Sequence, residues 1–320
     1  MAAVKAALLG AGVAGLCLAV AATGVQPVSG KPKPKATSWS HQGLTDIRGV
    51  DVSRWQHIGP GVLDFQKLQR RGVRFVVLKS GDSSASAHAE AGYWYWRDRA
   101  AARRAGLLVG AYYYATPTSR PSRVIADARA QARKASARVG GRLPAGHLPL
   151  ALDLETEATR LGRADLTRWA VAWLRLVEKR TGRTPWFYSY TRYMERRLLP
   201  DAQLQSYPLW HANWGLFLKS QPMQIRGWPA DHARVWQFTD SGRLPGSGSR
   251  VLDLNVYRGT GEQLLAEAGL GPWAAQRYDL PLGRPGPTAS PTASPTVSPT
   301  ATPTDSPGVS PTPSVPAAGD

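Results

Sequence analysis

Four carboxylates lie where short apolar runs of this sequence end, an arrangement that suits acid–base chemistry. Asp51 ends RGVD, Asp153 and Glu155 end LPLALDLE, and Asp253 lies in VLDLN. Clustered carboxylates repel one another, so the pKa of at least one of them should rise. A carboxylic acid of raised pKa can protonate a leaving oxygen while an ionised neighbour stabilises positive charge, as in glycoside hydrolysis.

Each acid taken alone has simpler interpretations, such as a helix cap or a salt bridge to one of the 40 basic residues. Carboxylates alone also bind hard divalent cations, but the six histidines are scattered and form no ligand spacing. The presence of all four acids at strand ends favours catalysis, and we expect neither a metal nor another cofactor. Glu157 stays outside the predicted catalytic set because the strand should have ended before it.

Aromatic residues near the same strand ends would suit a carbohydrate. Sugars have apolar C–H faces that rest on aromatic rings, and tyrosine hydroxyls can bond to sugar oxygens. Successive side chains of a strand point to opposite faces, so about half of the strand-end aromatics should instead belong to the core. The residues predicted to bind substrate are Tyr112, Tyr114, Tyr188, Trp210, Asn213, Trp236 and Gln237.

Eight short runs rich in apolar, β-branched or aromatic residues are the strands that must position these side chains. Most are apolar at successive positions, as expected of parallel strands covered on both faces. A helix is predicted over residues 165–182, where apolar residues recur at helical spacing between an Asp165 cap and a Gly182 stop. The strand candidates begin near Ile47, Val73, Leu107, Leu148, Pro185, Tyr207, Arg234 and Val251.

The alternation of strands and helices predicts a (β/α) barrel. Barrel enzymes carry their chemistry at the carboxyl ends of the strands, where Asp153 and Glu155, two positions apart, would both point into the mouth. Barrel closure makes the first and last strands neighbours, which brings Asp51 close to Asp253. Residues 241–250 are too few for a crossover helix, so the last strands should include antiparallel pairs. We therefore expect a single catalytic domain of class α/β, a distorted barrel of the (β/α)5(β)3 kind.

The two ends of the chain differ in composition from this unit. Lys5, an uncharged apolar run and the triplet AVA predict a signal peptide over residues 1–22, with an uncleaved membrane anchor as the alternative. The only cysteine, Cys17, lies in this run, so the mature protein would have no disulfide. A basic Pro/Lys-containing linker (residues 23–44), the catalytic barrel domain (45–275) and a disordered Pro/Thr/Ser-rich tail (283–320) should follow.

The formal net charge of +18 predicts polyanionic partners. For an exported protein, the anionic polymers of a cell wall suit this charge better than nucleic acid, for which the sequence has no basic-aromatic motif. We expect a secreted, wall-associated monomer without a stable membrane anchor.

Five motifs follow one another along the folded unit: RGVDVSRWQ, GAYYYA, LALDLE, LWHANW and VWQFTD…VLDLNVYRG. Together they resemble glycoside hydrolase family 25, the Chalaropsis-type lysozymes or N-acetylmuramidases. The resemblance implies a flattened (β/α)5β3 barrel that cleaves the β-1,4 bond between N-acetylmuramic acid and N-acetylglucosamine in peptidoglycan.

The same resemblance implies a role for each acid. Glu155 would be the general acid, and Asp153 would orient or stabilise the oxazolinium or oxocarbenium species. Asp51 and Asp253 would support the cluster and bind substrate. The chain departs from the family where Tyr113 stands in place of a frequent histidine, and where KSGDSS (residues 79–84) stands in place of a Lys-Ala-Thr-Glu-Gly-like segment.

Two other functions stay open on the sequence alone, a non-catalytic barrel that binds cell walls and a related glycosidase that acts on chitin-like polymers. The second catalytic step is open as well. A protein nucleophile and inversion through water require different carboxyl separations, and assistance by the N-acetyl group of the substrate is a third route. We favour substrate assistance, with Asp153 holding the acetamido group.

Overall fold

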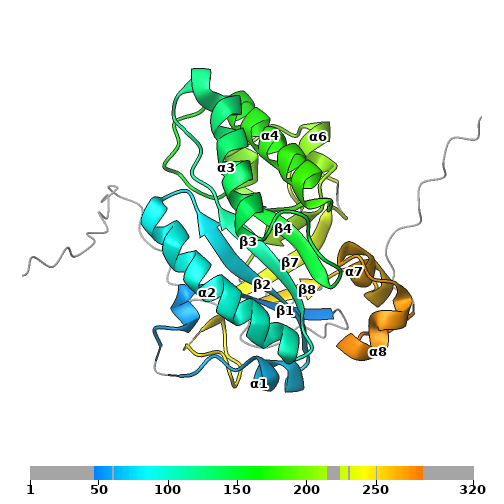
Figure 1. Ribbon diagram of the computed structural model, residues 1–320. Helices are drawn as coiled ribbons and strands as arrows, with labels where there is room; N and C mark the ends of the chain where they lie inside the picture. Colours follow the sequence, from blue (N-terminus) through cyan, green and yellow to red (C-terminus); the bar gives the residue numbers. More distant parts are fainter. Residues whose placement is uncertain (1–46, 60, 215–223, 230, 250, 284–320) are drawn as a thin grey trace, which may run out of the picture.

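Eight strands close into a barrel in the computed structural model, which describes residues 47–283 except 60, 215–223, 230 and 250 (Figure 1). The strands pair in chain order, and each of the eight predicted runs forms one of them. They are β1 (Ile47–Val52), β2 (Val73–Asp82), β3 (Leu108–Tyr114), β4 (His147–Asp153), β5 (Trp186–Tyr190), β6 (Leu209–Ala212), β7 (Ala233–Gly242) and β8 (Leu252–Tyr257).

Helices follow the first five strands and cover the outside of the barrel (Figure 1). In the described parts of the connections after β6, no helix occurs before α7, so the predicted (β/α)5(β)3 architecture is confirmed. The α-helices are α1 (Phe65–Arg70), α2 (Ala85–Arg104), α3 (Val124–Arg138), α4 (Arg163–Thr181), α5 (Thr191–Arg197), α6 (Ala202–Gln205), α7 (Gly261–Glu267) and α8 (Ala275–Tyr278), with short 3-10 turns η2 (Arg54–Gln56), η3 (Pro121–Arg123) and η4 (Pro272–Ala274).

The strand directions explain how the first and last strands share one site. Strands β1 to β7 are parallel to one another, whereas β8 is antiparallel to both β7 and β1, as the short connection predicts. The start of β8 therefore lies at the same end of the barrel as the carboxyl ends of the others. Asp253, near the start of β8, is paired directly with Asp51, near the end of β1.

Helix α4 shows how the sequence pattern builds the outer layer. Its apolar stripe, which includes Trp169 and Trp173, is fully buried against the barrel and α3. The helix ends at Gly182, which takes the left-handed conformation with φ of 69° and so satisfies the last turn without steric cost. The predicted cap at Asp165 is wrong, because the helix begins two residues earlier and Asp165 lies in its first turn.

Several segments predicted at the chain ends fall outside the described residues: the signal peptide, the linker and all but the first residue of the tail. Among the residues that the structure does describe, no helix is both long and apolar enough to cross a membrane.

Candidate active site

A groove of about 650 Å³ opens at the carboxyl ends of the parallel strands. Three of the four predicted acids line it, namely Asp153, Glu155 and Asp253, together with the predicted aromatic residues Tyr112 and Tyr114. Strand pairing places these side chains side by side, since Asp153 of β4 is paired with Tyr114 of β3. The structure thus brings five of the predicted site residues together in one groove.

Asp51, the fourth acid, is buried at the base of this groove and accepts two hydrogen bonds. Its Oδ2 atom accepts from Gln237 Nε2 at 2.9 Å and from Asn255 Nδ2 at 2.8 Å. Burial raises the pKa of Asp51, and these two donors oppose the rise by stabilising its charged form. Burial, and then the charge of Asp51, raise the pKa of Asp253 to about 10. These surroundings favour the proton on Asp253 and the negative charge on Asp51.

A second layer of side chains orients those two donors. Gln237 Oε1 accepts from the Tyr188 hydroxyl at 3.1 Å and from Trp214 Nε1 at 2.9 Å, which turns the amide nitrogen towards Asp51. Asn255 Oδ1 accepts in the same way from Trp210 Nε1 at 2.7 Å. Tyr188, Trp210 and Gln237, which the sequence predicts to bind substrate, are not among the residues that line the groove. Their side chains are buried inside the barrel, where they position Asp51.

Asp153 and Glu155 are the acids best placed to meet a substrate. Asp153 is 5% exposed, and within the described residues its buried Oδ1 atom has no hydrogen-bond partner. Burial raises the pKa of Asp153 well above its usual range, with Glu155 adding to the rise and Lys79 opposing it. Burial and the charge of Asp51 raise the pKa of Glu155 to about 7, so this side chain can hold a proton near neutral pH.

Two more predicted residues lie away from the groove. Trp236 is fully buried on the outer face of β7, where it packs against Phe238, so the prediction that it binds substrate is wrong. Alternation along β7 explains the error, because Gln237 points into the barrel and its neighbour must point out. Asn213 follows β6 and donates to Thr191 Oγ1 at 3.2 Å, beside the groove rather than in its lining. Glu157, which was left out of the predicted set, pairs with Arg197 at 2.7 Å.

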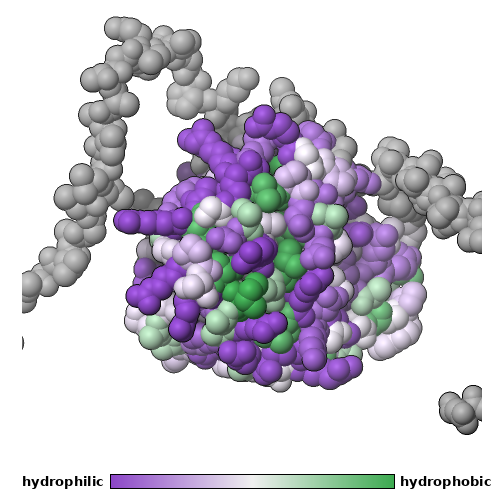
Figure 2. All heavy atoms as spheres, turned by 90° about the horizontal axis from the view of Figure 1, so that it is seen from above, coloured by the Kyte–Doolittle hydropathy of each residue, from purple (hydrophilic) through white to green (hydrophobic). Residues whose placement is uncertain are grey.

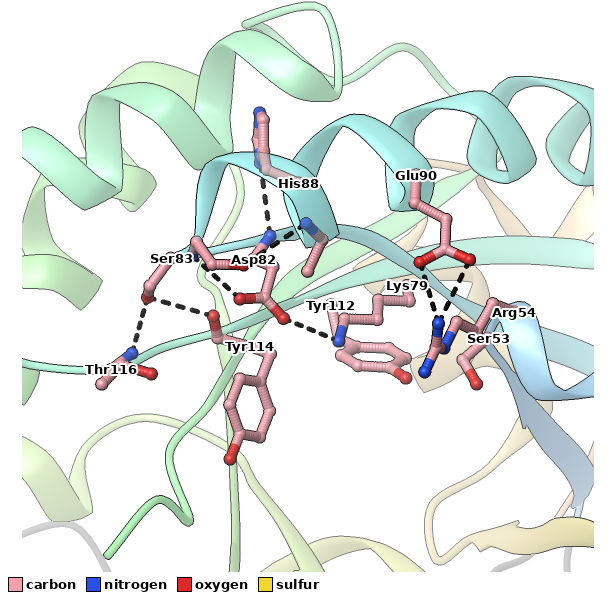
Figure 3. Close-up of polar contacts among 12 residues, drawn as sticks. Ser53, Arg54, Lys79, Asp82, Ser83, His88, Glu90, Tyr112, Tyr114 and Thr116 are labelled. Carbon is pink, nitrogen blue, oxygen red and sulfur yellow. Dashed lines mark hydrogen bonds and ion pairs between the residues drawn. The ribbon is translucent and has the colours of Figure 1, made fainter. Parts of the chain in front are cut away.

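The other wall of the groove was not predicted from the sequence. It is formed by the turn after β1 and the first turns of α2, where Arg54 pairs with Glu90 at 3.3 Å (Figure 3). The Arg54 guanidinium also lies 4.3 Å from the centre of the Trp55 ring. Trp55 is 57% exposed and so presents an open aromatic surface. The signal was available in RGVDVSRWQ, where the tryptophan follows Asp51 by only four positions.

Lys79, three residues before the end of β2, lines the groove together with the acids. Its Nζ atom lies 2.8 Å from Asp82 Oδ2 and 4.9 Å from the centre of the Tyr114 ring (Figure 3). It opposes the rise in pKa of both Asp153 and Glu155. In the described part of the chain, no group of histidine, cysteine and carboxylate side chains is arranged to hold a metal ion.

Carboxyl groups with raised pKa values in an aromatic groove, at the mouth of an eight-stranded barrel, are typical of a glycoside hydrolase. The sequence profile described as Glycosyl hydrolases family 25 matches residues 50–247, and the chain belongs to this family. One departure of this sequence from the family pattern lies outside the groove. Tyr113 is fully buried on the outer face of β3, against Trp173 and His88, so this substitution leaves the groove unchanged.

Known proteins resemble the chain over about the same region. The Uncharacterized protein YegX of Escherichia coli O6:H1 is 31% identical over 223 residues, which are 68% of this chain and 72% of YegX. Lysozyme M1 of Streptomyces globisporus is 24% identical over 69% of this chain and 71% of its own length. The crystal structure of the bacterial lysozyme from Streptomyces coelicolor shares the fold, with a TM-score of 0.55 and 24% identity over 70% of this chain and 97% of that one.

Proposed function

We propose that this glycoside hydrolase is a secreted lysozyme that cleaves the β-1,4 bond between N-acetylmuramic acid and N-acetylglucosamine in peptidoglycan. The observation that carries the proposal is the Asp153 Oδ1 atom, which lacks a hydrogen-bond partner among the described residues, beside Glu155, whose pKa is raised to about 7. A buried polar atom without a partner costs free energy unless a ligand satisfies it, and the acetamido N–H of an N-acetyl sugar is a suitable donor. The lysozyme names of two of its relatives agree with this substrate.

In the proposed mechanism, Glu155 donates its proton to the glycosidic oxygen as the bond from that oxygen to C1 breaks. Asp153 holds the acetamido group so that its carbonyl oxygen attacks C1 and forms an oxazolinium ion. Glu155, now ionised, takes a proton from water, which opens the oxazolinium ring and returns the free sugar. Asp51 and Asp253 keep a single negative charge beneath the developing cation.

The first test is Glu155→Gln, which keeps the shape of the side chain and removes its proton. Loss of a general acid should reduce the release of reducing ends from purified peptidoglycan by roughly 100- to 10,000-fold. Circular dichroism and wall binding should be unchanged. Full activity in the variant would refute the assignment, and a wild type that binds walls without releasing reducing ends would identify a non-catalytic binding protein instead.

Two further measurements define the reaction. Digestion of chitin and peptidoglycan side by side, with mass spectrometry of the fragments, identifies the substrate and the bond that is cleaved. Substrate assistance predicts that the product keeps the anomeric configuration of the substrate, so inversion would exclude it.

Secretion through the predicted signal peptide over residues 1–22 predicts a mature protein in the medium that begins near residue 23.

A further inference from the structure

A second groove lies on the outer wall of the barrel, between α3, α4 and α6. Its volume is about 640 Å³, close to that of the catalytic groove. The floor is aliphatic and is formed by Ile125 of α3 and by Val171, Ala172 and Leu176 of α4. In the view from above in Figure 2, apolar residues gather near the middle of a surface that is otherwise mostly polar.

Four cations surround this floor: Arg129 of α3, with Arg168, Arg175 and Lys179 of α4. All four are exposed. The three on α4 share one face of the helix, with gaps of seven and four residues, which correspond to about 10 Å and 6 Å along its axis. They form a row of positive charge that runs the length of the groove.

Few acids neutralise this row. Arg168 pairs with Asp165 at 3.5 Å, but in the described part of the chain no ion pair engages Arg129, Arg175 or Lys179. The one carboxylate in the groove lining, Asp201, accepts the backbone N–H groups of Gln203 and Leu204 at 2.9 and 3.0 Å and so caps α6.

We propose that this second groove binds a linear polyphosphodiester of small polyols, with its phosphates on the arginines and its aliphatic carbons on the floor. Arginine matches the geometry of phosphate through two parallel hydrogen bonds, and three of the four cations are arginines. A nucleic acid strand would need aromatic rings on which its bases stack, and no aromatic residue is among those that line the groove.

The position of the groove separates this binding from catalysis. Helices α3 and α4 leave the mouth end of β3 and β4, so the groove descends the outer wall beside the active site and shares no residue with it. A polymer bound there would hold the enzyme against a wall while the catalytic groove stays open to the glycan. The inference does not depend on which glycosidic bond is cleaved.

The test compares two triple variants that lose the same charge. The groove variant is Arg129→Gln, Arg175→Gln, Lys179→Gln, and the control is Arg70→Gln, Arg71→Gln, Arg103→Gln, which changes exposed arginines at the end of α1 and on α2. Binding of purified poly(glycerol phosphate) to the full chain is measured by calorimetry between about 50 and about 200 mM NaCl. The groove variant should bind at least about tenfold more weakly and with a smaller salt dependence, and the control should change by less than about threefold.

Two companion measurements keep the result decisive. Hydrolysis of a soluble glycan free of anionic polymer should proceed at the same rate in all three proteins, which shows that both variants are folded. Equal binding of poly(glycerol phosphate) by the wild type and the groove variant would overturn the proposal. Tighter binding of a single-stranded oligonucleotide, or of phosphatidylglycerol vesicles, through the same three residues would overturn the choice of ligand.

Discussion

Replacement of Lys79 by methionine should move the alkaline limb of the pH–activity profile to higher pH. Burial and the charge of Asp51 raise the pKa of Glu155 to about 7, and Lys79 is the cation that opposes this rise. Methionine keeps most of the aliphatic length but removes the charge. It also leaves the Asp82 carboxylate without the ammonium that now lies 2.8 Å away. Since Asp82 raises the pKa of Asp153, both effects favour protonated acids in the groove.

The size of the effect follows from the surroundings of Lys79. An opposite charge within about 4–6 Å changes the pKa of a carboxyl group by roughly 1 to 3. The Lys79 side chain is 22% exposed and is shared with Asp82, so the lower end of this range applies. The midpoint of the limb should therefore rise by about one pH unit, which corresponds to about 1.4 kcal/mol. A general acid acts only while it holds its proton, so the variant should retain activity at alkaline pH that the wild type loses.

The assay is kcat/KM on a soluble glycan as a function of pH, because this ratio reports the ionisation of the free enzyme. The matched control is Lys134→Met. Lys134 donates to the main-chain carbonyls of Asp82 and Ser83 at 3.0 and 3.2 Å and is not among the groups that shift the pKa of Glu155. The reasoning fails if the midpoint stays or falls in Lys79→Met, or if it rises equally in Lys134→Met.

Other substitutions separate groove, core and positioning roles. Trp55→Ala should raise KM about fivefold to tenfold without loss of stability, whereas Trp236→Ala should lose about 3–5 kcal/mol in urea denaturation. Gln237→Met removes a donor to Asp51; it should lower kcat more than it raises KM and cost about 1–3 kcal/mol of stability. The pKa of Asp253 is raised to about 10 in the folded protein, whereas in the unfolded chain it should be about 4, so the unfolding free energy of the wild type should fall between these pH values. Asp253→Asn removes this titration, so the unfolding free energy of the variant minus that of the wild type should grow with pH. Parallel curves for the two proteins would contradict a proton on Asp253.

The proposed catalytic acids could be chosen from the sequence because two local rules agree on them. Strand ends carry the chemistry of barrels, and residues two apart share a face, which together place Asp153 and Glu155 in one groove. Leu154 donates to the Tyr188 carbonyl at 3.1 Å, which continues the pairing of β4 past its end and keeps Glu155 on that face. Asp253 needed one further rule, that a connection too short for a crossover reverses the strand.

The aromatic residues were harder to place because local alternation does not say which face of a strand is inside. Trp236 and Gln237 are neighbours in the sequence, and both were predicted to bind substrate. Trp236 points outwards into the apolar layer between barrel and helices, whereas Gln237 points into the barrel. Even with the faces known, Gln237 would still be taken for a substrate contact. Its donor bond reaches Asp51, 186 residues earlier, and its acceptor is occupied by Tyr188 and Trp214. Only barrel closure brings these groups together, so the sequence identifies an acid cluster while the tertiary structure decides which acid keeps its charge.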